Sequence, residues 1–137
     1  MKHMFDTDTC ISLLDGREPV KQQKILAHLE SLRQAELCLS AVTVSELVFG
    51  VENSRFRKAN LAALDAFLLD LVVMPFDEMA AREAGRVRAE LERKDQRIGA
   101  MDTLIAAHAR CLGLTIVTNN VAEFAKIKGL EVENWSV

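Results

Sequence analysis

Acidic and amide side chains in this sequence gather directly after its short apolar runs. They are Asp6 and Asp8 after MKHMF, Glu46 after LCLS, Asp102 after a break at Gly99, and Asn119, Asn120 and Glu123 after LTIVT. Carboxylates at the end of a strand repel one another and do not favour a sheet. Each of them therefore either caps the helix that follows or holds a positively charged partner.

Helix capping explains each of these acids when it is taken singly. Thr43 and Glu46 have the spacing of a capping box, in which both side chains accept backbone N–H groups at the start of a helix. Asp6 or Asp8 has a similar role available at the first helix. Asp102 gains about 0.3–1 kcal/mol from the positive end of a helix dipole. A single acid does not indicate a functional site.

The combination of Asp6, Glu46 and Asp102 indicates more if the three carboxylates meet at one edge of a sheet. A hard divalent cation offsets their repulsion better than helix dipoles do, and Mg²⁺ takes one or two protein carboxylates while it keeps several waters. A Mg²⁺ or Mn²⁺ ion held in this way neutralises phosphate oxygens and lowers the pKa of bound water, which suits the hydrolysis of a phosphodiester. The sequence has no Ser-His-Asp arrangement and no Gly-rich phosphate loop that competes for this role.

The elements that must position these acids alternate along the chain. Apolar runs predict strands at 1–5, 37–40, 71–76, 114–118 and 130–135, and helical periodicity predicts helices ending near 14, over 19–33, from 43, over 59–70, 78–93 and 100–112. This alternation predicts an α/β sandwich around a mostly parallel central sheet of four to five strands. Such sheets bind their ligands beyond the carboxyl ends of the strands, where the acids are expected.

The overall composition is that of an ordinary globular domain. The chain has 137 residues, half of them hydrophobic, and we expect one domain over residues 1–137. No apolar run reaches the roughly 20 residues of a transmembrane helix, and no secretory signal pattern opens the chain. Cys10, Cys38 and Cys111 include no C-x-x-C pair, so we expect reduced thiols and a cytoplasmic protein. The net charge of −3 requires any contact with nucleic acid to be local.

Four segments resemble the motifs of PIN-domain ribonucleases, in particular the VapC toxins of bacterial toxin–antitoxin pairs. They are FDTDTC, SAVTVSELVFGVENS, RKDQRIGAMDTLIAAHA and LTIVTNNVAEFAKIKGLEVENW, in the family's order and over essentially the whole chain. The resemblance implies a PIN-like α/β/α sandwich and an endoribonuclease dependent on Mg²⁺ or Mn²⁺. It implies that Asp6 and Asp102 are direct metal ligands and that Glu46 acts through metal-bound water or as a further ligand.

The fourth acid of the family is harder to place in this chain. Many members carry Asp two residues after the motif's Thr, whereas this chain has Asn120 after Thr118. Glu123 matches the acid of members that have Asn there, and we assign it as the fourth catalytic residue. The supporting polar residues are Thr7, Thr118 and Asn120. Asp8 stands where close relatives usually have Asn, and we expect it to cap a helix rather than to bind a cation.

The expected substrate is RNA. Arg93, Lys94 and Arg97 lie just before the helix of Asp102 and are the favoured phosphate contacts. Aromatic residues are few (six Phe, one Trp, no Tyr), which favours recognition of the shape of a folded RNA over base stacking. The resemblance implies cleavage of tRNA, with initiator tRNA and its anticodon stem-loop as the first candidate, leaving a 5′-phosphate and a 3′-hydroxyl.

The resemblance also implies two protein partners, a second copy of the chain in a homodimer and a cognate VapB-type antitoxin. The apolar sides of the helices at residues 25–32 and 48–67 offer a groove for the antitoxin. Other prominent side chains are expected to serve packing only. They are His3, His28, His108, Trp135, Met74 and Met79.

Two other classes of protein stay open. A phosphoacceptor domain of the receiver type would use Asp77, but the last strands lack a Lys-Pro pair to hold the phosphoryl group, and Asp102 would have no role. A catalytically silent PIN scaffold that only binds RNA or protein is compatible with Asn120 in place of an acid.

Overall fold

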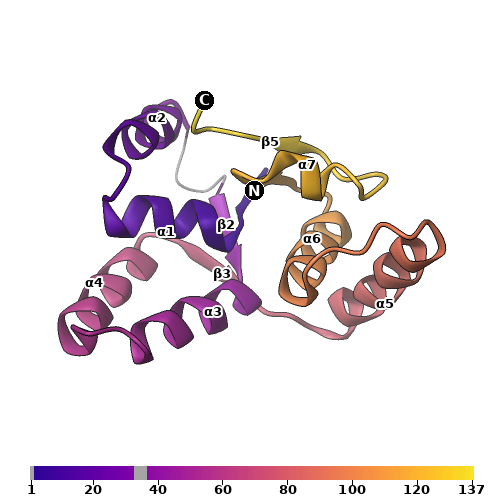
Figure 1. The fold of residues 1–137 in the computed structure, drawn as a ribbon, viewed down its shortest axis with the longest axis horizontal. Coiled ribbons are helices and arrows are strands. Elements are labelled where there is room, and N and C mark those ends of the chain that lie inside the picture. Colours follow the sequence, from indigo (N-terminus) through magenta and orange to yellow (C-terminus); the bar gives the residue numbers. More distant parts are fainter. Residues whose placement is uncertain (1, 33–36) are drawn as a thin grey trace.

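The computed structural model describes residues 2–32 and 37–137, so the predicted helix end at residue 33 lies outside the described residues. Its centre is a five-stranded sheet in which all neighbouring strands are parallel (Figure 1). In spatial order the strands are β3 (Val72–Met74), β2 (Leu37–Ser40), β1 (His3–Phe5), β4 (Thr115–Val117) and β5 (Val132–Glu133). The predicted parallel sheet is confirmed. Because the strands are parallel, the carboxyl ends of β1, β2 and β4 meet at one edge.

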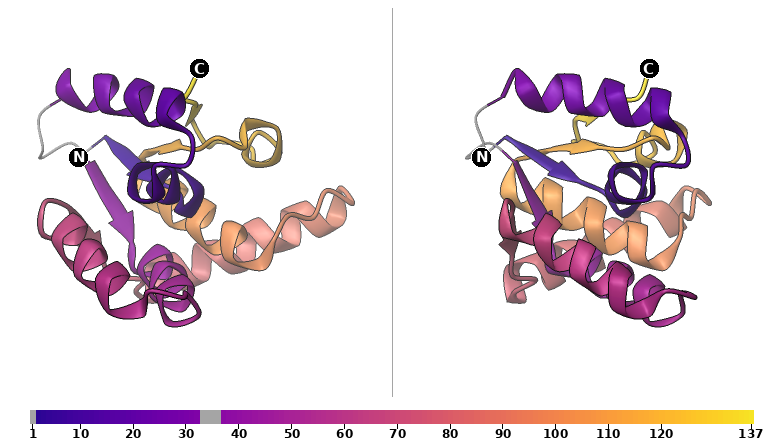
Figure 2. Two further views of the ribbon diagram at one scale, coloured as in Figure 1. Left: turned by 60° about the vertical axis from the view of Figure 1, so that its left-hand side comes forward. Right: turned by 90° about the vertical axis from the view of Figure 1, so that its left-hand side faces the viewer.

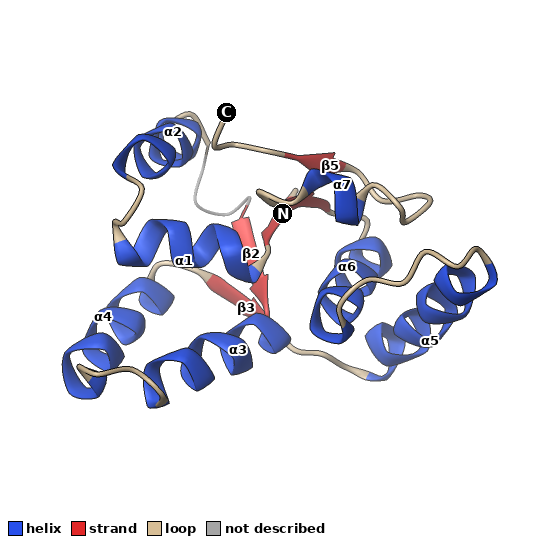
Figure 3. Ribbon diagram, in the orientation of Figure 1, coloured by secondary structure: helices blue, strands red, loops and turns tan. Residues whose placement is uncertain are grey.

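Helices cover both faces of this sheet, as Figure 3 shows by colour. They are α1 (Thr7–Asp15), α2 (Pro19–Glu30), α3 (Ala41–Glu52), α4 (Arg57–Leu69), α5 (Glu78–Arg93), α6 (Ala100–Leu112) and α7 (Val121–Phe124). Neighbouring strand residues alternate between the faces, so Met4 and Ile116 pack with α5 and α6 while Phe5 and Val117 pack with α1 to α4. The predicted α/β/α sandwich is confirmed.

Helix α5 follows from its sequence pattern almost residue for residue. Ala80, Ala84, Val87 and Leu91 are spaced three or four residues apart and are all buried. The carboxylate of Asp77 accepts the N–H of Ala80 at 3.0 Å and so caps the helix. A role as a helix cap accounts for Asp77 without phosphoacceptor chemistry.

The predicted start of α3 is wrong. The helix begins at Ala41, because the hydroxyl of Ser40 accepts the N–H of Val42 at 3.1 Å and caps it one turn earlier than predicted. Thr43 is buried inside the helix, so it forms no capping box with Glu46. Glu46 consequently lies in the second turn of α3, with its side chain available for contacts outside the helix.

Most of the side chains assigned to packing do pack. His108 is buried on α6, and Trp135 is buried with the ring of His28 stacked on it at 5.1 Å between ring centroids. Met79 is an exception, because it is 63% exposed at the start of α5. Cys10, Cys38 and Cys111 are free thiols. Within residues 2–32 and 37–137, no helix is both long enough and apolar enough to span a bilayer.

Candidate active site at the carboxyl edge of the sheet

Asp6 lies at the junction of β1 and α1 and is almost fully buried. Its backbone N–H donates to the carbonyl of Val117 at 3.0 Å, and its carboxylate accepts the N–H of Thr9 at 2.9 Å. Burial raises the pKa of Asp6 from 3.8 to about 6, although hydrogen bonds from Thr118 and Thr9 oppose the shift. The hydrogen bond from Thr9 makes Asp6 the cap of α1, which was one of the two predicted alternatives. Asp8, also expected to cap a helix, is instead exposed in the first turn.

Glu46 reaches the same place from α3. The hydroxyl of Thr7 donates to Oε1 of Glu46 at 2.5 Å, across 39 positions of sequence. Because Thr7 directly follows Asp6, this hydrogen bond holds the Glu46 carboxylate beside the end of β1. Thr7, assigned as polar support from the sequence, thus orients the acid of a different helix.

Asp102 occupies the first turn of α6 and is half-buried. Its pKa is raised from 3.8 to about 7, first by burial and then by the negative charges of Glu123, Asp6 and Glu46. The other three carboxylates assigned from the sequence therefore lie close enough to Asp102 for their charges to affect it. The spacing of these acids along the sequence does not bring them together. The parallel order β2-β1-β4 does, because it places the carboxyl ends of these strands at one edge of the sheet.

Two hydrogen-bond donors hold the carboxylate of Glu123. The N–H of Gly99 donates to its Oε1 at 3.1 Å, and the side-chain amide of Asn120 donates to its Oε2. A Cβ placed on Gly99 would lie 3.7 Å from Oδ2 of Asp102 and 3.9 Å from Oε1 of Glu123, so this glycine borders both acids. Thr118 supports the loop, since its Oγ1 accepts the N–H of Asn120 at 2.9 Å.

Two residues of the site were missed by sequence reasoning. Thr9 donates its hydroxyl to the carbonyl of Val117 at 3.0 Å and its N–H to Asp6, so it ties α1 to β4. Gly99 was taken only as a break before α6, whereas its N–H holds Glu123. A glycine immediately before a helix that carries a candidate ligand was the available signal.

The donor set fits a hard divalent cation. None of Asp6, Glu46, Asp102 and Glu123 forms an ion pair with a Lys, Arg or His of the described residues, so the excess negative charge is left uncompensated. Among the described residues, no three His, Cys, Asp or Glu side chains are already arranged closely enough to form a complete metal-ligand cluster. Oxygen ligands without a closed cage suit Mg²⁺, which binds through few carboxylates and retains water.

The fold and this acidic edge define the class of protein. A family model of the PIN domain matches residues 4–130, and the chain belongs to the PIN-domain family, as its motifs predicted. It is 38% identical to the tRNA(fMet)-specific endonuclease VapC of Shigella flexneri over 99% of both chains. It is 36% identical to ribonuclease VapC2 of Haemophilus influenzae over 98% of both.

Solved structures agree with these sequence relatives. The chain matches a chain of the DNA-bound VapBC complex of Salmonella typhimurium with a TM-score of 0.87 and 36% identity, over 98% of both chains. It matches a chain of VapBC2 from Rickettsia felis, bound to a promoter DNA fragment, with a TM-score of 0.87 and 34% identity, over 98% of this chain and 99% of that one. The resemblance to VapC proteins is therefore confirmed over 98–99% of this chain and of each matched chain.

Proposed function

We propose that this protein is an endoribonuclease toxin that hydrolyses RNA phosphodiester bonds with Mg²⁺ or Mn²⁺ and is neutralised by a cognate VapB-type antitoxin. The observation that carries the proposal is the gathering of carboxylates at the carboxyl edge of the sheet, where Thr7 holds Glu46 beside Asp6 and Gly99 borders both Asp102 and Glu123. Uncompensated acids at the carboxyl edge of a parallel sheet suit a metal-dependent phosphodiesterase. The VapC relatives, named as an endonuclease and a ribonuclease, match over 98–99% of both chains, and a chain of a VapBC complex has the same fold.

In the proposed mechanism, Asp6 and Asp102 hold the metal ion. The ion would stabilise the charge of the phosphate and lower the pKa of a bound water. Glu46, oriented by the hydroxyl of Thr7, positions or deprotonates the attacking water. Glu123 closes the site from α7 and fixes Gly99 at the start of α6. In-line attack then leaves a 5′-phosphate and a 3′-hydroxyl.

The proposed substrate is a tRNA, with the anticodon stem-loop of initiator tRNA as the first candidate. A relative covering 99% of the chain is named a tRNA(fMet)-specific endonuclease. Arg93 at the end of α5 is exposed, as are Lys94 and Arg97 in the loop before α6, and these residues offer phosphate contacts close in sequence to Asp102. Such contacts make binding depend on salt concentration.

The proposed antitoxin site is an apolar groove on the opposite side of the sheet from α5 and α6. Its volume is about 380 Å³, and helices α1, α2 and α4 supply its walls, including Leu13, Leu26, Leu29 and Phe67. Structures of relatives are titled as VapBC complexes, which supports a VapB-type occupant. Residues near Val48 do not line this groove, because α3 contributes no side chain to it, and their contribution to antitoxin binding stays a prediction. We also propose a homodimer that acts in the cytoplasm.

The test is cleavage of total tRNA by purified protein with Mg²⁺, with EDTA, and after Asp102→Ala. Asp8→Ala is the matched control, because Asp8 is an exposed acid of the same edge that lies outside the proposed metal site. We expect discrete fragments with the wild type and with Asp8→Ala, and none with EDTA or Asp102→Ala. Mapping of the fragment ends identifies the cut.

A catalytically silent scaffold is the second candidate, because Asn120 stands in place of an acid and bonds Glu123. Intact tRNA and intact total RNA in every lane, together with no measurable Mg²⁺ or Mn²⁺ binding by calorimetry, would favour it. Metal binding without cleavage of tRNA would instead point to another RNA target.

A further inference from the structure

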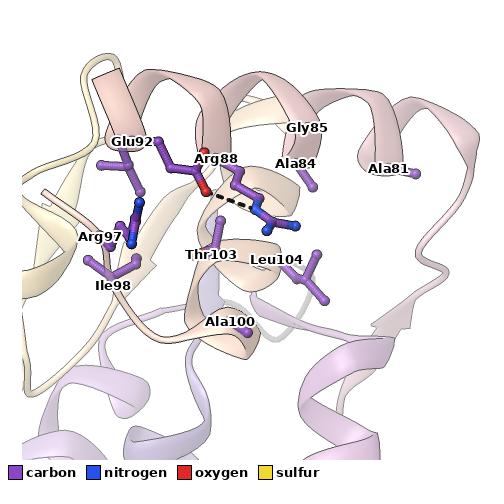
Figure 4. Close-up of a pocket in the computed structure, with 11 residues that line it drawn as sticks. Ala81, Ala84, Gly85, Arg88, Glu92, Arg97, Ile98, Ala100, Thr103 and Leu104 are labelled. Atoms are coloured by element: carbon purple, nitrogen blue, oxygen red, sulfur yellow. Dashed lines mark hydrogen bonds and ion pairs between the residues drawn. The ribbon is translucent and has the colours of Figure 1, made fainter. Parts of the chain in front are cut away.

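A second groove lies between α5 and α6, on the other side of α6 from the acidic site. Its volume is about 830 Å³, and Figure 4 shows the side chains around it. The two helices lie side by side (Figure 2), and small residues at their contact leave the space open. The apolar lining includes Ala81, Ala84, Leu91, Ile98, Ala100 and Leu104. No residue of the proposed metal site lines this groove.

The groove and the acidic site lie on opposite sides of the first turn of α6. Ala100, Thr103 and Leu104 face the groove, and Asp102 projects from the opposite side of the same turn. The separation is one helix diameter, about 10 Å, which a strand of about two nucleotides spans. Gly99 lies between the groove residues Ile98 and Ala100 and borders the acids, because a Cβ placed on it would lie 3.7 Å from Oδ2 of Asp102 and 3.9 Å from Oε1 of Glu123.

Two arginines and one carboxylate line this largely apolar groove, namely Arg88, Arg97 and Glu92. Arg97 forms no ion pair with any carboxylate of the described residues. Arg88 lies 3.3 Å from Glu92, but both side chains are largely exposed, and such a pair contributes at most about 0.5 kcal/mol. Both guanidinium groups are therefore available to a ligand that carries negative charge.

We infer that this α5–α6 groove binds an unpaired nucleotide next to the scissile phosphate of the RNA. The base lies on the apolar floor, and the phosphates on either side of it contact Arg88 and Arg97. An apolar slot with guanidinium groups at its rim matches a base flanked by phosphates better than it matches a purely apolar segment. The inference rests on the proposed ribonuclease function, because a nucleotide site beside the acids serves as a substrate site only if those acids cleave RNA.

Two glycines provide a matched pair of variants for testing this groove. Gly85 lies on α5 and lines the groove, whereas Gly50 lies on α3 outside it. Both are exposed helical positions at which an added Cβ meets no atom within 4 Å. Gly85→Phe therefore places a large side chain at the groove from a position with room for its Cβ, and Gly50→Phe adds the same side chain elsewhere. Both variants should fold, because glycine is the poorer helix former.

The first measurement is kcat/KM for cleavage of the RNA substrate. We expect Gly85→Phe to lower kcat/KM by about tenfold, because its ring would occupy the space of the base, and Gly50→Phe to leave it unchanged. Arg97→Gln should weaken RNA binding and reduce its salt dependence, whereas Arg82→Gln, at an exposed arginine paired with Glu78, should not. Equal kcat/KM for both glycine variants would overturn the groove while the ribonuclease stands.

A second measurement separates this inference from the proposed function. Binding of a fluorescent single-stranded oligoribonucleotide is measured in Asp102→Asn protein, with Gly85→Phe or Gly50→Phe added. Loss of binding only with Gly85→Phe supports the groove even if the wild type cuts no RNA. Unchanged binding with Gly85→Phe, or no binding to the parent protein, overturns it. A change from dimer to monomer in light scattering with Gly85→Phe also overturns it, because a second copy would then be the occupant.

Discussion

Asp6 has two roles that different side chains can separate. Its carboxylate caps α1, which Asn does equally well, and it adds negative charge to the acidic edge, which Asn does not. We predict that Asp6→Asn abolishes metal-dependent cleavage and leaves thermal stability unchanged or higher. Asp6→Ala should abolish cleavage too but also cost about 1 kcal/mol of stability, because the cap is lost. Thermal melts and RNA cleavage on the same preparations distinguish the two. Wild-type activity in Asp6→Asn would contradict the mechanism.

Asp102 is predicted to destabilise the protein when no metal is bound. At neutral pH its ionised form is disfavoured by burial and by the charges of three neighbouring carboxylates. Asp102→Asn should therefore raise the free energy of unfolding in EDTA by about 1 kcal/mol, a value that allows for the partial exposure of the group. This corresponds to a rise of the melting temperature by about 4 °C. With saturating Mg²⁺ the order should reverse, because the wild type alone gains from metal binding. A wild type that is the more stable protein in EDTA would contradict this reading.

Elements set by strong periodicity were predicted well, and their boundaries less so. Four buried residues at helical spacing predict α5 correctly, since such a pattern has one structural solution. The start of α3 was misplaced because Ser40 and Thr43 are both good caps, and only the end of β2 decides between them. The hydroxyl of Thr43 ends up buried without a partner among the described residues, which no local pattern foretells.

The acidic site was predictable in its residue types and not in its contacts. Strand-then-acid patterns identified Asp6 and Glu46, because helix starts follow strand ends in this class of fold, and a helix start after Gly99 identified Asp102. The hydrogen bonds that orient them join residues far apart in the chain, as between Thr7 and Glu46 or Gly99 and Glu123. Such pairs depend on the strand order, which spacing along one sequence does not specify.

Arg110 fixes the two helices on either side of the α5–α6 groove. It donates to Glu83 at 3.1 Å, to Glu90 at 2.9 Å and to the carbonyl of Lys128 at 3.0 Å, and it lowers the pKa of both glutamates. Its side chain is only 15% exposed. We predict that Arg110→Gln costs about 2 kcal/mol, between the values for surface and buried pairs. Urea denaturation measures this.

The control for Arg110→Gln is Arg82→Gln on α5. Arg82 pairs with Glu78 at 2.8 Å, but both side chains are exposed, so the loss should stay below about 0.5 kcal/mol. Equal losses in the two variants would show that Arg110 contributes no more than a surface pair.

His108 links the helix of Asp102 to the cap of α3, since its Nδ1 lies 2.8 Å from the hydroxyl of Ser40. Burial lowers the pKa of His108 from 6.5, although the charge of Asp77 opposes this shift. The unfolded chain therefore binds the proton more readily, and stability present above pH 6.5 is lost as pH falls through the folded pKa. We predict that the wild type loses more stability than His108→Gln between pH 7.5 and pH 5. Carboxylates that titrate in this range are common to both proteins and cancel in the difference. Parallel pH profiles would refute the prediction.

At the scale of the whole molecule, two grooves flank the sheet from opposite sides. The α5–α6 groove adjoins the acidic edge, and the groove between α1, α2 and α4 lies across the sheet from it. The groove between α1, α2 and α4 is lined mostly by apolar side chains, and Leu26 is exposed on its wall. Substrate binding and antitoxin docking can then be changed separately, because their side chains are not shared.

This separation yields a prediction with a built-in control on one helix. Leu26 and Val20 are both exposed apolar residues of α2, but only Leu26 lines the apolar groove. Leu26→Asp should leave RNA cleavage intact and prevent its inhibition by the cognate antitoxin, since a buried charge without a partner costs several kcal/mol in the complex. Val20→Asp should be inhibited like the wild type. Titration of antitoxin into the cleavage reaction measures both. Equal inhibition of the two variants would place the antitoxin elsewhere, and lost cleavage in Leu26→Asp would show that the groove and the acidic edge are not independent.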